Sequence, residues 1–200
     1  MRGVIYVAYG EKALSEARLS IKSLKKHNPS LSVTVIADQA LPGVNWIEFD
    51  KPGPGARWAK LMIDVLSPYE QTLYLDADTR IHGDITAGFE ILRDWDIAIA
   101  PSARQGTDCL GHLPGDDKQR TLEQIKMKQP LNLQAGVLFF KKSIQVSRLF
   151  DQWRVEWSIS KDQDQGALLR ALWKAPVKVW LLSGEWNGGQ LVEHRFGAAR

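Results

Sequence analysis

The sequence is poor in several features, and each shortage removes a class of protein. One cysteine, Cys109, stands among its 200 residues, which excludes an internal disulfide framework and a cysteine-rich zinc site. A single thiol is typical of a reducing compartment. We expect Cys109 to have no catalytic role rather than to act as a nucleophile. No apolar run approaches the roughly 20 residues that span a bilayer, and residues 1–3 lead straight into a strand rather than a signal peptide. We therefore expect a soluble, cytoplasmic protein without a transmembrane segment.

A block of positive charge is also missing. The formal net charge is only +3, and lysine and arginine are spread among the acids. Because nucleic-acid-binding domains concentrate their basic residues in a patch or stripe, we expect no nucleic-acid partner, and an anionic small substrate explains the mild excess as well. Glycine-rich phosphate loops of the Walker and Rossmann types are absent too. Tryptophan is plentiful, with eight residues, which pack in cores but also stack on sugars and bases.

Strands and helices alternate along the chain. Residues 3–9 form a continuous apolar run with β-branched residues, which predicts a strand buried on both faces. Helical spacing follows over 11–28, and a second buried strand covers 31–37. A strand, a helix and a strand joined by short connections form a βαβ unit with parallel strands.

The remaining chain continues this pattern and shows no repeat or linker, which predicts one domain over 1–200. Residues 105–129 are polar, glycine-bearing and poorly periodic, so we expect a long loop there that serves as a lid or on the acceptor side. Further strands are expected at 45–50, 73–75, 96–100, 132–140 and 177–182, and helices at 56–66, 85–95, 143–157 and 166–174, the third capped by Ser143.

Two carboxylates end one of the apolar strands. Asp76 and Asp78 follow Leu75, one residue apart. Burying an ionised carboxylate costs several kcal/mol or more unless it is paired or binds a metal, so the pair is expected at the mouth of a sheet, bridged by a cation. Oxygen ligands suit Mg²⁺ or Mn²⁺, whose open positions accept phosphate oxygens. The alternative is that Asp76 caps the turn and Asp78 faces solvent.

Open sheets bind ligands outside the carboxyl ends of their strands. Ala8, Tyr9, Asp38 and Asp76 all lie at predicted carboxyl ends. We expect them to line one crevice, with Tyr9 or Asp38 at a nucleotide base or ribose and the acids at its phosphates. Tyr9 is equally well explained as a core residue.

The order of several motifs resembles glycosyltransferases of the GT-A fold, most closely glycosyltransferase family 8. Residues 74–78 and 83–85 look like that family's Tyr-Leu-Asp-x-Asp and Gly-Asp-Leu, and residues 134–137 like its Asn-Ala-Gly-Val with Gln134 in place of Asn. Residues 162–164 match its Asp-Gln-Asp, and residues 186–187 its aromatic-Asn pair. His194, Gly197 and Arg200 resemble its closing His-x-x-Gly-x-x-Lys. The chain also resembles small transferases that large DNA viruses of algae use on capsid glycans, which implies the host cytoplasm.

The resemblance implies a three-layer α/β/α fold with a mixed, mostly parallel sheet, its N-terminal half nucleotide-binding and its C-terminal half on the acceptor side. It implies a metal, Mn²⁺ or Mg²⁺, held by Asp76, Asp78 and His194, and transfer from a UDP-sugar to a glycan or protein-linked acceptor with retention. Gln163 would lie beside the anomeric carbon, and Asp162 would hold sugar hydroxyls. The residues expected to bind the nucleotide-sugar are Ala8, Tyr9, Asp38, Lys60, Ala77, Gln134, Gly197 and Arg200.

Departures from the family affect the donor sugar. Gln134 replaces Asn and Lys60 replaces Arg, so the sugar is expected to differ from glucose or galactose. The family's terminal Lys-Pro-Trp is cut short at Arg200, which suggests a longer natural protein. A nucleotidyltransferase is a rival reading, but residues 8–12 lack its glycine-rich basic loop. A catalytically degenerate module that binds nucleotides or glycans is a second rival, disfavoured because all three metal ligands are present.

Overall fold

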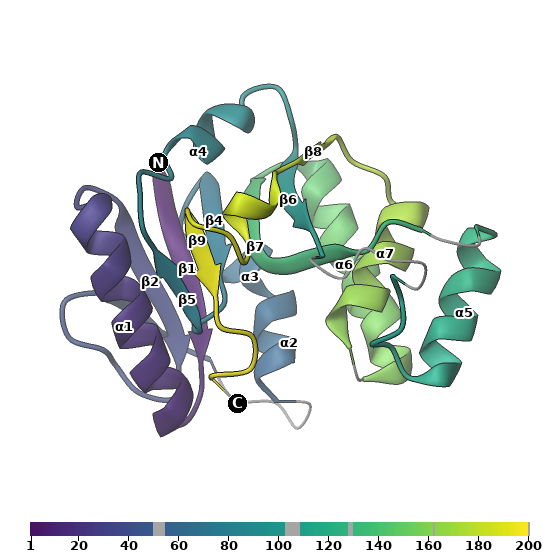
Figure 1. Ribbon diagram of the computed structural model, residues 1–200, viewed down its shortest axis with the longest axis horizontal. Helices are drawn as coiled ribbons and strands as arrows, with labels where there is room; N and C mark the ends of the chain where they lie inside the picture. The colour runs from purple at the N-terminus through teal and green to yellow at the C-terminus, as the bar shows by residue number, and fades with distance from the viewer. Residues whose placement is uncertain (50–54, 103–108, 128–129, 162, 200) are drawn as a thin grey trace.

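The computed structural model describes residues 1–49, 55–102, 109–127, 130–161 and 163–199. A seven-stranded sheet in the order β3-β2-β1-β4-β7-β6-β8 lies between two layers of helices, and a two-stranded ribbon of β5 and β9 packs on one side (Figure 1). The strands are β1 (Arg2–Ala8), β2 (Ser32–Ala37), β3 (Asn45–Glu48), β4 (Gln71–Leu75), β5 (Thr79–Ile81), β6 (Ile97–Pro101), β7 (Leu133–Lys141), β8 (Val179–Leu181) and β9 (Val192–His194). The helices are α1 (Glu11–His27), α2 (Ala56–Leu61), α3 (Ile63–Leu66), α4 (Ala87–Ile91), α5 (Gly115–Ile125), α6 (Ile144–Ser160), α7 (Asp164–Lys174) and the 3₁₀ helix η1 (Gly184–Trp186).

Parallel pairing brings the ends of the first strands together. β1 pairs with β2 and β4, and β2 with β3, all in parallel. The predicted βαβ unit is therefore confirmed. Ala8, Ala37 and Leu75, the last residues of β1, β2 and β4, lie at one edge of the sheet, where ligands bind in folds of this kind.

β7 runs against its neighbours and so begins at this same edge. It pairs antiparallel with β4 on one side and β6 on the other. Against β6 the register shifts, because Ile99 faces Leu138 while Ala100 faces Gln134. The extra residues of β7 form a bulge around Gly136. Bulges re-aim strands near binding sites, and here the bulge lies beside the end of β4.

Two apolar cores lie on the two faces of the sheet. On one face α1, α4 and the β5–β9 ribbon contribute side chains such as Leu14, Phe89 and Val192. On the other face α2, α3, α6 and α7 contribute Leu61, Trp153 and others. Ser143 caps α6 as predicted, since its hydroxyl accepts the N–H of Val146 at 3.2 Å. The arrangement is the predicted three-layer α/β/α fold.

The prediction that residues 105–129 form a loop is wrong for the C-terminal part of that range. Residues 115–125 form helix α5, which packs against α7, while residues 103–108 and 128–129 lie outside the described part. The buried face of α5 consists of Asp117, Thr121 and Ile125. Two of these three are polar, so no apolar period marks the helix.

Other elements differ from prediction mainly in their limits. The helix expected over 56–66 breaks at Met62, whose backbone angles (φ −102°, ψ 4°) leave the helical region and separate α2 from α3. The helix expected over 85–95 shortens to α4. α7 starts at Asp164 rather than at Gly166, which brings Asp164 into its first turn.

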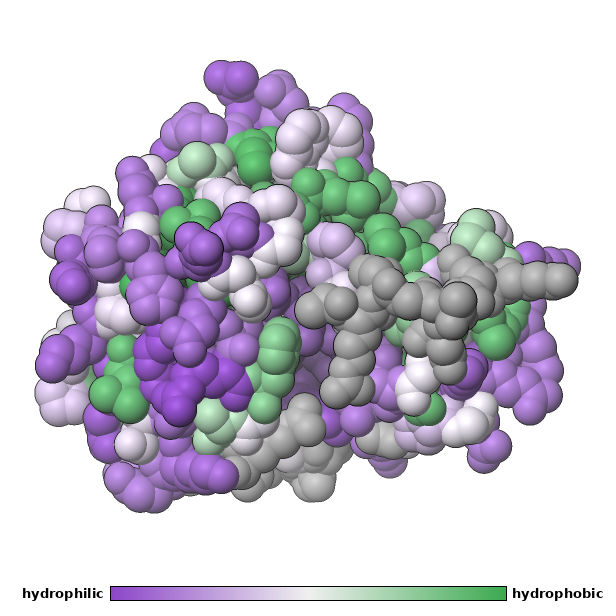
Figure 2. Space-filling view, in the orientation of Figure 1, coloured by the Kyte–Doolittle hydropathy of each residue, from purple (hydrophilic) through white to green (hydrophobic). Residues whose placement is uncertain are grey.

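Exposed apolar side chains gather at one end of the sheet. Figure 2 shows a mostly hydrophilic surface over α1 and hydrophobic residues over β8 and toward α7. Trp180 and Leu181 on the edge strand β8 are 43% and 50% exposed. Within the described ranges, none of the helices has the length and apolar character needed to cross a bilayer.

Candidate metal centre

Asp76 and Asp78 lie on the turn between β4 and β5. The N–H of Asp76 donates to the carbonyl of Gly136 (2.8 Å), which prolongs the pairing of β4 with β7 by one residue. The N–H of Thr79 donates to the carbonyl of Asp76 (3.2 Å) and closes the turn. Both acids therefore lie at the sheet edge where the parallel strands end, as predicted.

Buried hydroxyl groups hold this turn in place. The Thr79 hydroxyl donates to the carbonyl of Asp76 at 2.9 Å and lies 2.8 Å from the Ser20 hydroxyl of α1. Ser20 in turn lies 3.1 Å from the Tyr6 hydroxyl on β1. Burial raises the pKa of Tyr6, so its phenol stays neutral and keeps its hydrogen bond. The turn is thus anchored to both the sheet and α1.

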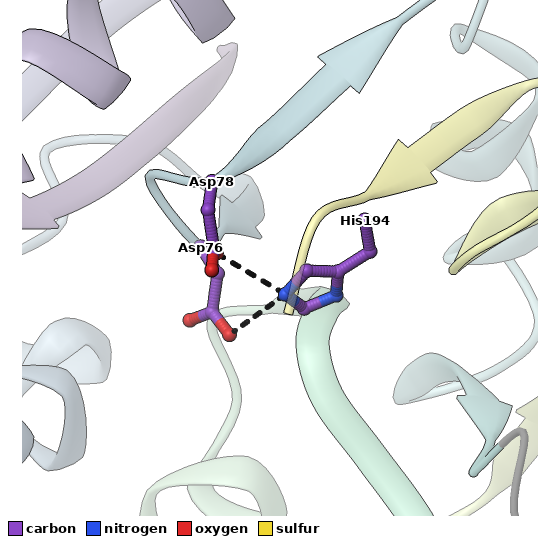
Figure 3. A group of neighbouring side chains, drawn as sticks. All are labelled: Asp76, Asp78 and His194. Carbon is purple, nitrogen blue, oxygen red and sulfur yellow. Dashed lines mark ion pairs between the residues drawn. The ribbon is translucent and has the colours of Figure 1, made fainter. Parts of the chain in front are cut away.

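His194 reaches the two acids from β9. The ribbon pairs Thr79 with His194, so the last residue of β9 stands beside the acidic turn. Its Nε2 atom lies 3.2 Å from Asp78 Oδ1 and 3.6 Å from Asp76 Oδ2 (Figure 3). The structure therefore brings His194 to a pair of acids that precede it by more than 100 residues in the sequence.

These three side chains fit a divalent metal. One ligand atom from each lies within 4.8 Å of the others. Two carboxylate oxygens and one imidazole nitrogen suit Mn²⁺, which tolerates nitrogen more readily than Mg²⁺ does, and would leave positions open for further oxygens. The alternative in which Asp78 faces solvent is wrong, because Asp78 is only 5% exposed and points at His194.

Asp78 is held in its ionised form. Burial alone would raise its pKa, but the hydrogen bond and charge that the His194 imidazole supplies when it is protonated, together with the Gly197 N–H, lower the pKa to about 2. The Gly197 N–H donates to Asp78 Oδ2 at 2.7 Å, and Gly197 has φ +89°, a conformation that favours glycine. The predicted Gly197 therefore contacts a candidate ligand through its backbone.

Gly136 leaves the space that this packing requires. A Cβ atom at this position would lie 2.3 Å from His194 Cε1 and 2.7 Å from Asp76 Oδ2. Neither neighbour can move without disturbing the group of three. Glycine near the start of β7 therefore allows two of the candidate ligands to approach the backbone closely.

Asp76 has a second set of partners. Tyr74 faces the same side of β4 two residues earlier, and its hydroxyl donates to Asp76 Oδ1 at 2.6 Å. Lys60 Nζ lies 3.4 Å from the same oxygen. Burial and the charge of Asp76 raise the pKa of Tyr74 well above its usual value, so the phenol remains a donor.

Lys60 connects the acidic turn to α7. Its Nζ lies 2.8 Å from Asp164 Oδ2, and both residues are 8% exposed. Burial lowers the pKa of Lys60, but Asp164 and Asp76 more than offset this and raise it, so the lysine is charged. An acid in the first turn of a helix is common because of the helix dipole, but the Asp164 carboxylate also pairs with Lys60.

Gln163 and Gln134 lie at the junction of α7 with β7. Gln163 is the N-cap residue of α7, and its Oε1 accepts a hydrogen bond of 3.5 Å from Arg57. Gln165 donates to the side-chain oxygen of Gln134. Two further predicted residues, Asp162 and Arg200, lie outside the described residues.

The remaining predicted residues lie along the same sheet edge. Ala8 ends β1, and Ala77 is buried between the two acids. The Tyr9 hydroxyl donates to the carbonyl of Phe49 at 2.7 Å, and the ring packs partly on the core. Asp38 is exposed and accepts the N–H of Gly10 at 3.0 Å. Both polar residues thus have backbone partners between β1 and β3.

Three residues contact the candidate ligands or their partners, although the sequence reasoning assigned them no role: Tyr74, Asp164 and Asn187. Tyr74 could have been found, since a residue two before Asp76 on a strand shares its face. Asn187 accepts from His194 Nδ1 (2.6 Å), a contact across η1 and the turn into β9 that no spacing rule predicts.

No family model matches the sequence, and no curated protein does. Solved structures do match. The galactosyltransferase LgtC, in complex with donor and acceptor sugar analogs, has a TM-score of 0.63 at 14% identity, over 92% of this chain and 74% of its own. The bifunctional glycosyltransferase WbbM has 0.67 at 17%, over 92% and 39%. Mouse xyloside xylosyltransferase 1 has 0.61 at 13%, over 93% and 87%.

These identities are low, and the likeness therefore concerns the fold. It extends over almost the whole of this chain, while the chain spans well under half the length of WbbM. The central sheet with helices on both faces is the architecture that these glycosyltransferase structures share. The chain has the GT-A glycosyltransferase fold.

Proposed function

We propose that this protein is a metal-dependent glycosyltransferase that moves a sugar from a nucleotide-diphospho-sugar, UDP-linked, to a glycan or protein-linked acceptor. One observation carries the proposal: Asp76, Asp78 and His194 converge at the ligand-binding edge of a GT-A fold. The structural neighbours support it, because LgtC, WbbM and the xylosyltransferase are all glycosyltransferases. In this proposal the N-terminal half holds the nucleotide and the C-terminal half the acceptor.

The three candidate ligands would hold Mn²⁺, or Mg²⁺, between them. When bound, the metal supplies positive charge that neutralises the leaving diphosphate. Arg200 would add a second positive charge there. The Gly197 N–H and His194 already stabilise Asp78 as a carboxylate, so the site is prepared to accept a cation.

The start of α7 would hold the donor sugar. Gln163 would lie beside the anomeric carbon, Asp162 would bind sugar hydroxyls, and the reaction would proceed with retention. One LgtC structure is that of an active-site mutant in which glutamine becomes glutamate, which supports a glutamine at the reacting centre. Lys60 and Gln134 would contact the same sugar, and both are tied to α7 through Asp164 and Gln165. Ala8, Tyr9, Asp38 and Ala77 would contact the nucleotide.

The test is calorimetric titration of UDP-linked and GDP-linked sugars, first with Mn²⁺ and then with EDTA. Binding of one UDP-sugar that depends on the metal is expected. Asp78→Asn should weaken that binding by about 100-fold or more, because even partners of metal ligands contribute about 10–100-fold to metal affinity. Asp84→Asn is the matched control, since Asp84 is exposed and lies outside the three-residue group.

Unchanged donor affinity in Asp78→Asn would show that the acids do not hold a metal. Turnover separates the enzyme from a degenerate binding module. The release of UDP from the bound donor, measured with and without candidate acceptors, is expected for the enzyme. Tight donor binding without any turnover would instead favour the module.

A further inference from the structure

The second ring nitrogen of His194 has a defined partner. Nδ1 lies 2.6 Å from Oδ1 of Asn187, and the amide nitrogen of Asn187 donates to the carbonyl of Gln134 at 3.1 Å. Asn187 is 2% exposed and His194 8%. Water therefore has little access to either group, and the protein itself determines their hydrogen bonding.

These contacts determine where the proton of a neutral imidazole lies. The Gln134 carbonyl only accepts, so the amide of Asn187 must direct its NH₂ group there and its oxygen toward His194. An amide oxygen also only accepts, which requires the ring proton to be on Nδ1. The lone pair of Nε2 then faces Asp76 and Asp78, as metal coordination requires (Figure 3).

Packing alone does not make this choice. Phe196 stacks on the imidazole with ring centroids 4.0 Å apart and planes 28° apart, which fixes the plane of the ring. A half turn about the Cβ–Cγ bond would keep the ring in that plane, exchange its nitrogen and carbon positions and preserve the stacking. The turned ring would present a carbon to the Asn187 oxygen and lose a buried hydrogen bond, so the amide distinguishes the two orientations.

The backbone holds the amide in place. Asn187 follows η1, where its N–H donates to the carbonyl of Gly184 (3.1 Å), and the next N–H, of Gly188, donates to Val192 at the start of β9 (2.9 Å). The segment is therefore a closed turn that ends in the strand carrying His194. Asn187 and His194 belong to one rigid piece of chain, tied to β7 through Gln134.

We propose that Asn187 is a positioning residue that makes Nε2 the metal-binding nitrogen of His194. The inference rests on the metal site of the proposed function and assigns a role to a residue that would not contact the metal. It also gives Gln134 a structural part in the site through its backbone carbonyl, separate from its side chain.

Two substitutions separate positioning from simple support. Asn187→Ala and Asn187→Asp both lose the donor to Gln134, but only aspartate keeps an oxygen that accepts from Nδ1. Mn²⁺ affinity without donor, measured from the electron paramagnetic resonance signal of free Mn²⁺, should fall by about 10–100-fold in Asn187→Ala. It should stay closer to wild type in Asn187→Asp. Nitrogen NMR of the Mg²⁺-bound proteins should show the proton on Nδ1 and the metal on Nε2 of His194 in wild type, and the loss of this form in Asn187→Ala.

Asn28→Ala is the matched control. Asn28 is 3% exposed and bonds through its amide to the backbone of Gly83 and Ile85, away from the acids. Its loss should lower the melting temperature but leave Mn²⁺ affinity unchanged. Equal affinities in Asn187→Ala and wild type, or equal losses in the alanine and aspartate variants, would overturn the inference. If the wild-type protein binds no Mn²⁺, the metal site itself is wrong and the positioning role falls with it.

Discussion

Side chains at this site are closely packed, and Gly136 is the position where an added atom would meet the candidate ligands. Gly136→Ala would place a methyl group 2.3 Å from His194 Cε1 and 2.7 Å from Asp76 Oδ2. Overpacking of this kind typically costs about 1–3 kcal/mol, because the neighbours must shift. We expect lower stability in urea unfolding and Mn²⁺ affinity reduced by about 10-fold or more, since both displaced groups are candidate ligands.

Gly115→Ala provides the comparison for Gly136. Gly115 is exposed at the start of α5, and an added Cβ would meet no atom within 4 Å. Alanine there should leave metal affinity unchanged and raise stability by up to about 1 kcal/mol, because it restricts the unfolded chain. Wild-type metal affinity in Gly136→Ala would contradict the close packing described here.

At this scale the sequence predicts the ligands better than their surroundings. Asp76, Asp78 and His194 belong to local motifs whose residue types reveal their chemistry. Asp164 and Asn187 also lie in motifs of the resemblance, but their residue types do not reveal their partners, because aspartate at a helix start and asparagine in a turn are common for local reasons. Their partners, Lys60 and His194, become neighbours only after the chain has folded.

Among the elements, α5, α6 and α7 are joined by buried charges. Glu156 of α6 is fully buried and contacts Arg120 of α5 (2.7 Å) and Arg170 (3.0 Å) and Lys174 (2.7 Å) of α7. Arg170 also contacts Asp117 at 2.9 Å. A charge this deeply buried is stable only while its partners remain. The position of α5 therefore depends on these ion pairs as well as on the apolar contacts of Leu122 and Ile125 with Leu169.

Glu156→Gln should destabilise the protein by about 3–5 kcal/mol at neutral pH, because it leaves the buried Arg170 without its full countercharge. Denaturant unfolding followed by circular dichroism measures this loss. Lys174→Ala is the control. Its side chain is 45% exposed, and surface pairs contribute about 0–1 kcal/mol. Equal losses in the two variants would argue against a buried network.

The same carboxylate predicts an acid dependence. Burial alone would raise the pKa of Glu156, but Lys174, Arg170 and Arg120 lower it below its ordinary value of 4.5. The stabilisation is therefore present above pH 4.5 and is lost as the pH falls through the lowered pKa. Glu156→Gln should show a shallower loss of stability in this acidic range, measured by denaturant unfolding at a series of pH values.

Helices and strands whose apolar residues repeat at regular spacing could be predicted from the sequence. Helix α5 could not. The inner strands β1, β2, β4, β6 and β7 of the central sheet are almost continuously buried and apolar, which marks them in the sequence. On α5 the buried side chain of Asp117 forms an ion pair with Arg170 of α7, and the Thr121 hydroxyl accepts a hydrogen bond from the same arginine. Hydrophobic spacing in the sequence does not predict a helix whose buried face carries polar and charged side chains. Met62 likewise shows no sequence signal for the break between α2 and α3.

For the molecule as a whole, the candidate metal centre joins the central sheet to the β5–β9 ribbon. A ligand that binds only the folded state stabilises it by about 2.7 kcal/mol at 100 times its dissociation constant. For a chain of this size that corresponds to a rise in melting temperature of about 5–10 °C. We expect Mn²⁺ to produce such a rise in the wild-type protein, with EDTA reversing it, as measured by scanning calorimetry.

Asp78→Asn should melt at the same temperature with and without Mn²⁺. A rise of equal size in that variant would mean that the metal binds elsewhere.

The overall architecture could be predicted from the sequence, because the alternation of strands and helices indicates a layered sheet. The antiparallel direction of β7 was not evident, since direction depends on which strands become neighbours.

The pairing of β5 with β9 also sets the order of events in biosynthesis. Thr79 and His194 are partners in one short ladder, yet most of the chain is translated between them. Synthesis proceeds at roughly 5–20 residues per second, so the acids leave the ribosome several seconds before the histidine does. A nascent chain presents an incomplete ligand set throughout that interval. In the proposed function, metal loading would therefore follow the synthesis of β9.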